Sequence, residues 1–415
     1  MKVFYDDKSI RVMLPNRINT ETISDVDEVL KNLKIAEDTE EIILDGNELQ
    51  YISSVGLRSI LSLAKANPDK VKFTNANKDV YEIFDVTGFI NIVKVERALE
   101  FIDTEKLEIL GAGMYGSVYR INREQILKVF NGENSRDRLA KVSADTSTAL
   151  LHGVPTIIPF GSVKTDKGLG LVFELLDSDT FANRIHKHPD KISKYAHDMA
   201  ELIRDLAKAD FDEGNPSEYK DMLRSELKDS QLVLSSEQVE FLEKYLDAVP
   251  ESSGGVHGDF HAKNIMILDD ELLLIDMDDF GRGHPIWDIA SAYRGYQFCA
   301  NIPKELSLRL FDLPEELPYE DFFCKIFQIN IEEANQMWNL FIEDLLKDVA
   351  EEKRDGYRKL SKCYSEYMTI RFIVDQCKAA NYPPEILDVK KQIVSELIEN
   401  MKEVDVADIP GILAD

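Results

Sequence analysis

Hydrophobic and polar positions in the first hundred residues follow two periods, one typical of helices and one of buried strands. Two stretches carry apolar residues three and four positions apart, which predicts amphipathic helices. The first is residues 23–36, with Val26, Val29, Leu30 and Leu33 on one face. The second carries Leu57, Ile60, Leu61 and Ala64. The short apolar runs EIILDG and VKFTNA predict strands between them. A small domain of alternating strands and helices is therefore expected.

The sequence also indicates where two of these helices begin or end. Ser53 or Ser54 is suited to cap the helix that follows, because a hydroxyl can accept a free amide hydrogen there. Gly88 follows the helical stretch DVYEIFDVT and is suited to end it.

The stretches ILDGNELQYISSVGLRSIL and YEIFDVTGFINIVKV resemble the STAS domain, the fold of anti-sigma factor antagonists, over about residues 1–100. The resemblance implies a protein partner and a phospho-acceptor serine two residues before a glycine, here Ser54 before Gly56. A phosphoserine at a helix N-terminus would meet free amides. Family members that are phosphorylated usually carry aspartate before this serine, whereas this chain has Ser53. A purely capping role for both serines is the alternative.

A glycine-rich stretch, LEILGAGMYGSVYRINREQILKVF, opens the rest of the chain. The β-branched and aromatic residues after Gly116 favour a strand, so the G-x-G-x-x-G pattern predicts a nucleotide-covering hairpin rather than a dinucleotide-binding turn. Glycines let backbone amides approach phosphates, and Lys128 on the third strand supplies a cation. The predicted nucleotide-binding residues of the hairpin are Gly111, Gly113, Gly116, Val118 and Lys128.

The next helix offers no glutamate to pair with Lys128. Asp145 is the candidate partner, although its shorter side chain requires a closer approach. After it, GLGLVFELL predicts a strand that runs into a hinge. Backbone groups of Glu174 and Leu175 are expected to contact adenine there, although Glu174 could also be an ordinary acid at a strand end.

The segment HGDFHAKNIMIL is the most informative in the chain. Asp259 stands five residues before Asn264, and an apolar strand follows. This spacing predicts a phosphotransferase loop in which Asp259 orients an acceptor hydroxyl and Asn264 binds magnesium. A turn and the strand LLLI then lead to Asp276, the expected second magnesium ligand, because magnesium prefers oxygen donors.

Three further aspartates follow Asp276. The letters D-F-G begin at Asp279, three residues too late for the metal position, so they are interpreted as a coincidence. Asp278 is expected near the metal without binding it. Asp288 is expected to brace the catalytic loop from a helix start, together with His257.

Residues 104–290 resemble the aminoglycoside phosphotransferase and choline kinase-like family, through GAGMYGSVY, GVPTIIPFG, HGDFHAKN and LIDMDDFGRGHPIWDIA. One departure is Met277, where the family usually has an aromatic residue. The two resemblances together imply an α+β chain. A STAS domain would span 1–103, and a two-lobed protein kinase-like domain would span 104–415. Its N-lobe would span 104–176 and its mostly helical C-lobe 177–415. ATP and Mg²⁺ are the implied cofactors, and the implied acceptor is a small-molecule hydroxyl.

Residues 300–415 are mostly amphipathic helix, and in this family such helices build the acceptor pocket. Trp338, Tyr364 and Tyr367 lie at helical spacing. They are either core residues or aromatic walls for a cationic substrate.

The composition of the chain limits the kinds of binding partner that are expected. The 415 residues carry a net charge of -28, which gives no footprint for nucleic acid and only a weak hint of a cationic substrate. The four cysteines include no C-x-x-C pair, and neither a secretory signal nor a membrane-length apolar run is found, so a cytoplasmic location is expected.

Three functions remain open at this stage. The first is an ATP- and Mg²⁺-dependent phosphotransferase acting on an aminoglycoside-, choline- or sugar-like hydroxyl and regulated by the STAS domain. The second is a signalling Ser/Thr protein kinase whose acceptor is a STAS-type serine such as Ser54. The third is a non-catalytic partner switch that senses nucleotide.

Overall fold

The computed structural model describes residues 1–6, 8–113, 116–131, 135–176, 178–212, 215–314 and 316–413. The chain divides into two compact units, Met1–Ile102 and Asp103–Asp415. Each unit buries its own hydrophobic core, and the two are described in turn.

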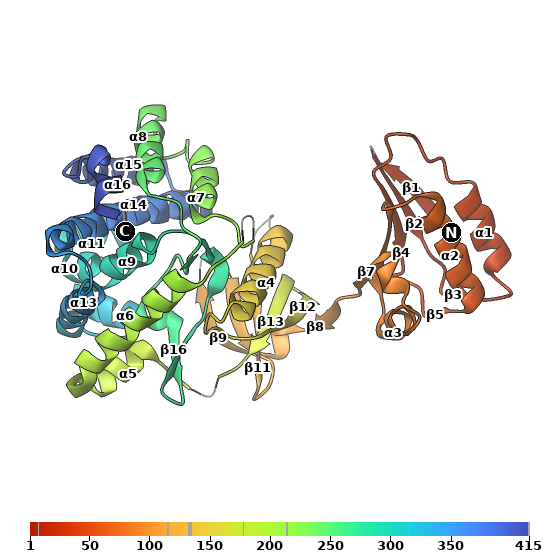
Figure 1. Cartoon of the computed structure of the whole chain (residues 1–415), viewed down its shortest axis with the longest axis horizontal. Helices are drawn as coiled ribbons and strands as arrows, with labels where there is room; N and C mark the ends of the chain where they lie inside the picture. Colours follow the sequence, from red (N-terminus) through yellow and green to blue (C-terminus); the bar gives the residue numbers. More distant parts are fainter. Residues whose placement is uncertain are drawn as a thin grey trace. The chain divides into compact units, whose positions relative to one another are not determined.

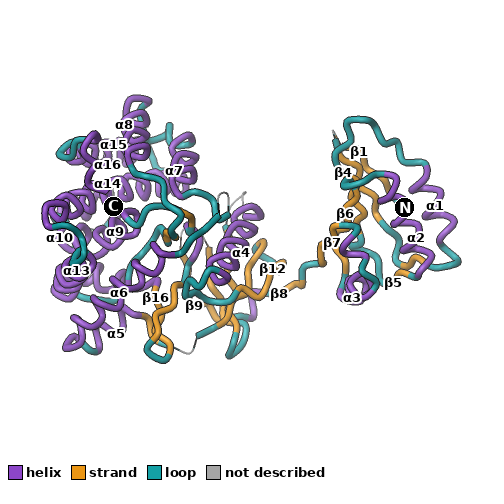
Figure 2. Tube along the Cα trace, in the orientation of Figure 1, coloured by secondary structure: helices purple, strands orange, loops and turns teal. Residues whose placement is uncertain are grey.

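The first unit is built on a five-stranded mixed sheet (Figure 1 and Figure 2). In order across the sheet the strands are β1 (Lys2–Asp6), β2 (Ser9–Met13), β4 (Glu41–Asp45), β6 (Val71–Ala76) and β7 (Lys94–Arg97). β1 and β2 are antiparallel, and the other neighbours are parallel. A two-stranded ribbon joins β3 (Arg17–Ile18) to β5 (Tyr51–Ile52). Strand β8 (Glu100–Ile102) ends the unit.

Three helices of this unit bury their apolar faces in its core. They are α1 (Ile23–Lys31), α2 (Ser54–Ala66) and α3 (Lys78–Val86). The predicted helix over 23–36 is too long, because Asn32 ends the helix and the Lys34 amide donates instead to the Tyr5 hydroxyl. Ser53 is the N-cap residue of α2 but its side chain makes no capping hydrogen bond. Gly88 follows α3 with the left-handed φ of 70° that favours glycine.

The second unit begins with an antiparallel sheet. Its strands, in spatial order, are β9 (Glu108–Gly113), β10 (Gly116–Arg120), β11 (Gln125–Phe130), β13 (Gly168–Glu174) and β12 (Pro159–Thr165). Helix α4 (Ser135–Leu151) packs on this sheet through Leu139 and Val142, which share a small core with Phe130 and Phe173. The glycine stretch thus forms a strand hairpin, β9–β10, rather than a strand-to-helix turn.

Helices form most of the remainder of this unit (Figure 2). They are α5 (Phe181–Lys187), α6 (Ile192–Lys208), α7 (Tyr219–Lys228), α8 (Ser236–Ala248), α9 (Ile286–Tyr293), α10 (Cys299–Asn301), α11 (Lys304–Phe311), α12 (Tyr319–Phe327), α13 (Ile331–Leu345), α14 (Glu351–Ala380), α15 (Pro384–Met401) and α16 (Ile409–Leu413). A π-helical turn, Arg294–Phe298, continues α9.

The second unit also contains two small sheets, whose strands lie between helices in the sequence. The first contains β14 (Asp179–Thr180), β16 (Ile265–Leu268) and β17 (Glu271–Leu274), and the second pairs β15 (Gly255–Val256) with β18 (Gly281–Arg282). The predicted IMIL and LLLI strands therefore form one hairpin, in which Ile265 faces Leu274.

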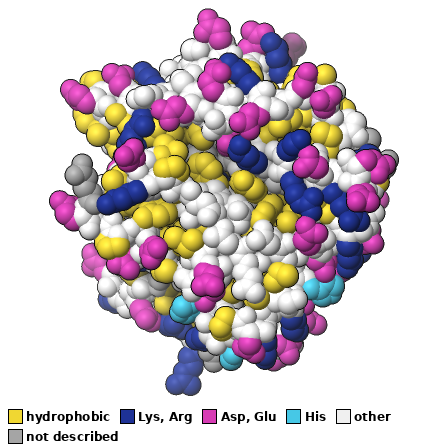
Figure 3. All heavy atoms as spheres, turned by 90° about the vertical axis from the view of Figure 1, so that its left-hand side faces the viewer, with side chains coloured by type: hydrophobic (Ala, Val, Ile, Leu, Met, Phe, Trp, Pro, Cys, Tyr) yellow, Lys and Arg dark blue, Asp and Glu magenta, His cyan; other side chains and the backbone are white. Residues whose placement is uncertain are grey.

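The acidic charge is spread over the surface. On the face drawn in Figure 3, Asp and Glu side chains are interspersed with Lys, Arg and hydrophobic groups. Within the described ranges, no helix combines the length and apolar character that crossing a membrane requires.

Candidate active site

A cavity of about 1030 Å³ lies within the second unit. The glycine hairpin, the hinge after β13, the loop around Asp259 and the loop after β17 all line it. Most sequence-predicted site residues meet here: Gly111, Gly113, Gly116, Val118, Lys128, Glu174, Leu175, Asp259, Asn264 and Asp276. Segments far apart in the sequence thus converge on one space.

The three glycines of the hairpin differ in what surrounds them. A Cβ on Gly116 would collide with the carbonyl oxygen of Val129, so close strand pairing requires glycine there. A Cβ on Gly111 or Gly113 would meet no protein atom within 4 Å. These two glycines therefore border open cavity, where a phosphate could approach the backbone. Met114 and Tyr115, between them and Gly116, lie outside the described residues.

Lys128 projects from β11 to two carboxylates. Its Nζ lies 2.6 Å from Asp276 Oδ1 and 2.5 Å from Asp278 Oδ1. Burial would lower the pKa of Lys128, but the two carboxylates outweigh burial and raise this pKa above its ordinary value. The ammonium therefore keeps its charge in the cavity.

The predicted pairing of Lys128 with Asp145 is wrong. The Asp145 carboxylate lies 2.7 Å from Lys141, one turn earlier on the same helix, and is itself buried. Burial raises the pKa of Asp145 even though Lys141 faces it. The cause is the orientation of α4, which presents Arg138 rather than an acid, and Arg138 Nη2 binds Asp278 Oδ2 at 2.8 Å.

Asp278 is thus the buried carboxylate that joins Lys128 to α4. Sequence reasoning placed it near the metal but did not predict either ion pair. Lys141 of α4 adds a contact to the same loop by donating to the Phe280 carbonyl at 2.9 Å. The sequence offered no signal for either pair beyond the presence of an acidic residue two positions after Asp276.

The loop before Asp259 is fixed from two sides. The Asp288 carboxylate, in the first turn of α9, accepts the amide hydrogens of His257 and Gly258, each at 2.8 Å. The His257 ring lies 2.9 Å from the Ile275 carbonyl through Nε2, while its Nδ1 accepts the Asp259 amide at 3.3 Å. His257 therefore ties the loop to the strand that leads into Asp276.

Gly258 explains why this loop carries glycine. Its φ is +84°, and a Cβ there would stand 2.8 Å from both the Asp279 Cβ and the Tyr219 ring. Both the backbone conformation and the space exclude a larger residue.

Asp259 is held by three groups. Asn264 Nδ2 donates to its Oδ2 at 3.0 Å, His261 Nε2 lies 3.3 Å from the same oxygen, and Arg294 Nη2 lies 3.2 Å from Oδ1. Burial would raise the pKa of Asp259, but His261 and Arg294 hold this pKa well below its ordinary range. Sequence reasoning missed His261 and Arg294, although both are polar residues within or just after the recognised motifs.

Asn264 and Asp276 stand at the same end of the β16–β17 hairpin. The Ile275 amide donates to the Asn264 carbonyl at 2.9 Å, so the residues flanking these two groups are directly paired. Asp276 has a left-handed backbone, with φ 63° and ψ 56°, which is uncommon for a residue with a side chain. Its side chain is 48% exposed, so the carboxylate remains accessible from the cavity.

The hinge end of the cavity is apolar. Val118, Ile126, Phe173, Met266 and Ile275 line it. The Glu174 side chain accepts the Ile158 amide at 2.8 Å, and the Leu175 amide donates to the Glu124 carbonyl at 2.8 Å. The Glu174 amide likewise donates to the Ile158 carbonyl, at 3.1 Å, so both hinge amides are engaged and the expected adenine contacts would fall to the backbone carbonyls.

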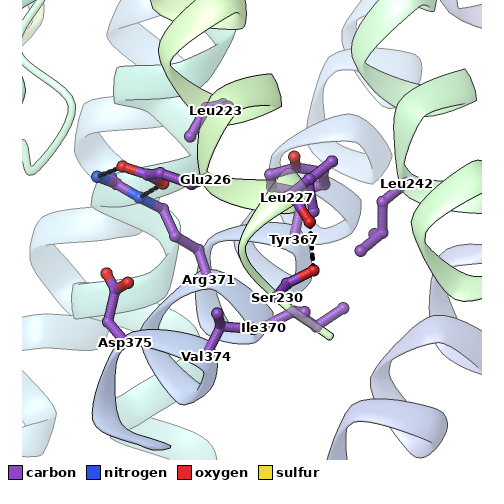
Figure 4. A pocket seen from close by; sticks show the side chains of 10 residues that line it. All are labelled: Leu223, Glu226, Leu227, Ser230, Leu242, Tyr367, Ile370, Arg371, Val374 and Asp375. Atoms are coloured by element: carbon purple, nitrogen blue, oxygen red, sulfur yellow. Dashed lines mark hydrogen bonds and ion pairs between the residues drawn. The ribbon is translucent and has the colours of Figure 1, made fainter. Parts of the chain in front are cut away.

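Asp279, the aspartate of the D-F-G sequence, forms a largely buried ion pair. Its Oδ2 lies 3.0 Å from Arg371 Nη1, and burial alone would raise the pKa of Asp279, which Arg371 instead holds below its ordinary value. Arg371 comes from α14 and also binds both Glu226 oxygens, at 2.6 and 2.9 Å. Figure 4 shows this bidentate pair beside a small cavity of about 20 Å³.

The three aromatic residues do not wall the cavity. Trp338, Tyr364 and Tyr367 are almost fully buried in the helical core, and Trp287 packs edge-on against both tyrosines. Of their two sequence interpretations, the core role is the one that the structure supports.

Ser54 belongs to the first unit. It is the exposed first residue of α2, while the buried Ser53 hydroxyl makes no hydrogen bond with the described residues. The first amides of the helix are therefore not capped by Ser53.

Two family models match segments of the chain. A family model described as the phosphotransferase enzyme family matches residues 106–321, and a STAS domain model matches residues 7–102. The chain belongs to the phosphotransferase enzyme family, with a STAS domain ahead of the catalytic fold. It is a kinase that uses an alcohol group as acceptor, and the predicted α+β class is confirmed.

Several solved structures are similar to this chain. ADP-bound aminoglycoside phosphotransferase APH(2'')-Ib has 16% identity and a TM-score of 0.43, over 74% of this chain and 94% of that one. A choline/ethanolamine kinase family protein from Mesorhizobium loti has 13% identity and a TM-score of 0.44, over 74% and 92%. No curated protein matches the chain.

Proposed function

We propose that this protein is an ATP- and Mg²⁺-dependent phosphotransferase that phosphorylates a hydroxyl of a small molecule. The observation that carries the proposal is the convergence of Lys128, Asp259, Asn264 and Asp276 on one cavity. These are a phosphate-binding cation, an acceptor-orienting carboxylate and two oxygen donors for a metal ion, which together are the parts that phosphoryl transfer requires.

The nucleotide would enter with adenine at the hinge. Val118 and Ile126 on one side and Met266 and Ile275 on the other provide apolar faces for the ring. The backbone carbonyls of Glu174 and Leu175 remain candidate adenine contacts. The triphosphate would then run beneath Gly111 and Gly113 toward Lys128, whose ammonium would exchange part of its contact with Asp276 for phosphate oxygens.

The donor set fits Mg²⁺. Asp276 offers an accessible carboxylate and Asn264 a neutral amide oxygen, and Mg²⁺ binds in this way through one or two protein oxygens plus phosphates. When bound, the ion neutralises charge on the β and γ phosphates.

Asp259 would orient the acceptor. The acceptor oxygen forms a bond to the γ-phosphorus while the bond from that phosphorus to the β–γ bridging oxygen breaks, leaving ADP. The hydroxyl proton passes to an Asp259 carboxylate oxygen late in the step and then to solvent. Because the pKa of Asp259 is low, its main contribution is positioning rather than strong base catalysis.

The test combines nucleotide binding with transfer. Wild type is expected to bind ATP only weakly without Mg²⁺, and Asp259→Ala is expected to bind Mg·ATP normally while losing phosphoryl transfer to the hydroxyl compound that wild type phosphorylates. A matched control is Asp348→Asn, an exposed acid of the same unit. Unchanged transfer by Asp259→Ala would exclude this mechanism.

The STAS domain is proposed as the regulatory part and as the site of a protein partner. Ser54 is exposed and begins a 13-residue helix, which is the geometry suited to a phospho-acceptor. Incubation with Mg·ATP followed by phosphosite mapping by mass spectrometry tests whether this domain is also an acceptor. Phosphate on Ser54 of wild type, but not of Asp259→Ala, would favour the protein kinase alternative.

A further inference from the structure

Every carboxylate among the described residues that line the cavity already has a partner. Glu174 accepts a backbone amide, Asp276 and Asp278 bind Lys128, Asp279 binds Arg371, and Asp259 is held by Arg294, His261 and Asn264. A cationic acceptor entering this space would have to compete with these partners for each of the described carboxylates. The net charge of the whole chain, -28, therefore does not describe its active site.

The cations of the cavity are less fully used. Arg120, Lys128 and Arg138 are paired with acids. Lys263 and Arg123 also line the cavity, and neither forms an ion pair with any described residue. Lys263 stands one residue before Asn264, where it would add positive charge to the proposed site of phosphoryl transfer.

Arg294 is the cation on the acceptor side. It begins the π-helical turn after α9, and its guanidinium lies 3.2 Å from Asp259 Oδ1 and 5.8 Å from the centre of the Phe372 ring. Its side chain is 23% exposed, and its partner Asp259 lines the cavity. A planar guanidinium is suited to grip a carboxylate or a phosphate through two hydrogen bonds.

We propose that the acceptor carries an anionic group, a carboxylate or a phosphate, which binds Arg294 and draws it from Asp259. The inference rests on the proposed function. The anionic group replaces Asp259 as the partner of the guanidinium, and Oδ1 becomes available to the acceptor hydroxyl. No covalent bond changes in this exchange, and the phosphoryl transfer that follows is the one described above.

This arrangement couples recognition to catalysis. With Arg294 in place, Oδ1 of Asp259 is engaged, so a neutral or cationic alcohol must compete with an ion pair for the orienting carboxylate. An anionic alcohol brings its own partner for Arg294. Arg294 is therefore a specificity-determining residue, and choline-like or aminoglycoside-like cations are disfavoured acceptors.

The test uses four probes that share a hydroxylated six-carbon skeleton: gluconate, glucose 6-phosphate, glucose and glucosamine. Dissociation constants are measured by calorimetry on the full chain saturated with Mg²⁺ and a non-hydrolysable ATP analogue. At least one anionic probe is expected to bind 10-fold or more tightly than glucose, with glucosamine weakest. Comparison of gluconate with glucose 6-phosphate distinguishes a carboxylate from a phosphate.

Variants then assign the preference to Arg294. Arg294→Gln is expected to reduce the ratio of anionic to neutral affinity at least 10-fold, and Arg294→Lys to restore part of it. Arg358→Gln, which removes a surface guanidinium paired with Glu343, is the matched control and should keep the wild-type ratio. The split between affinity for anionic and for neutral probes is a readout that simple misfolding would not produce.

Each remaining outcome counts against the proposal. Tighter binding of glucosamine, equal binding of all four probes including none measurable, or an anion preference that survives Arg294→Gln would overturn it. Nucleotide binding is measured in the same samples. If the Mg²⁺–nucleotide complex itself fails to bind, the proposed function fails; if it binds and the anion preference is missing, only this inference fails.

Discussion

Asp278 and Lys128, separated by 150 residues in the chain, form an ion pair of 2.5 Å at the centre of the cavity. The helix after β11 contributes Arg138 to the other Asp278 oxygen, so a carboxylate from the loop after β17 occupies the place that an acid of the helix was expected to fill. The position of Lys128 therefore depends on the loop that also carries Asp276.

Replacing Asp278 should impair nucleotide use. Asp278→Asn removes the charged partner of both Lys128 and Arg138, and a charged hydrogen bond contributes about 1.5–3 kcal/mol. We expect kcat/KM for ATP to fall about 10- to 100-fold, as measured in steady-state assays with saturating acceptor. Asp145→Asn is the comparison, because Asp145 binds only Lys141; an equal loss in both variants would contradict the assignment.

Removing Arg371 should destabilise the second unit. Arg371 is 12% exposed and neutralises Glu226 and Asp279, so Arg371→Met leaves two acids without their cation. Breaking such a buried pair costs about 3–5 kcal/mol. Urea unfolding should show this loss, whereas Arg224→Gln, at a more exposed pair with Asp247, should cost under about 1 kcal/mol.

Gly258 and Gly153 form a matched pair for a glycine test. Both have positive φ, +84° and +81°, but only a Cβ at Gly258 would collide with neighbours. Gly153→Ala should cost about 1 kcal/mol through backbone strain alone, and Gly258→Ala about 2 kcal/mol more because of overpacking. Thermal and urea unfolding measure the difference; similar losses would mean that the loop can move to accommodate a methyl group.

The buried Asp288 predicts a pH dependence. Burial raises its pKa from 3.8 to about 6, against the opposing effects of His257 and the two amides that it accepts. The pKa of Asp288 is higher in the folded state than in the unfolded state. The protonated form of Asp288 therefore contributes to the free energy of unfolding below about pH 4, and this contribution is lost as pH rises through about 6.

Comparison of wild type with Asp288→Asn isolates the pH-dependent contribution of Asp288 to stability. The stability of wild type relative to the variant should fall by about 2 kcal/mol between pH 4.5 and 7.5, measured by urea unfolding at both values. Asp348→Asn, at an exposed carboxyl, should show no such change. A wild-type advantage that grows with pH would reverse the sign and disprove the prediction.

Local patterns were sufficient for much of the fold. Apolar spacing located β4, β6 and α2, and the motif around Asp259 and Asn264 predicted a loop followed by a strand hairpin, because each of these features is encoded by neighbouring residues. The glycines were correctly placed in a hairpin, since the residues after Gly116 favour a strand.

Ion pairs between distant segments could not be predicted from local sequence patterns. Arg138, Arg294 and Arg371 reach acids on other segments, and nothing in their local sequence indicates the partner. The expectation for Asp145 failed because it assumed that this residue faces Lys128, whereas the orientation of α4 is set by its packing through Leu139 and Val142. Tertiary packing decides which charged groups meet.

The contact between Arg371 and Asp279 joins the matched family segment to a helix outside it. The segment ends at residue 321, yet α14, which supplies Arg371, spans Glu351–Ala380. A fragment ending at 321 would contain every motif residue and still lack the guanidinium that pairs with Asp279. The boundary of the family match is therefore not a place where the second unit can be cut without leaving a largely buried acid unpaired.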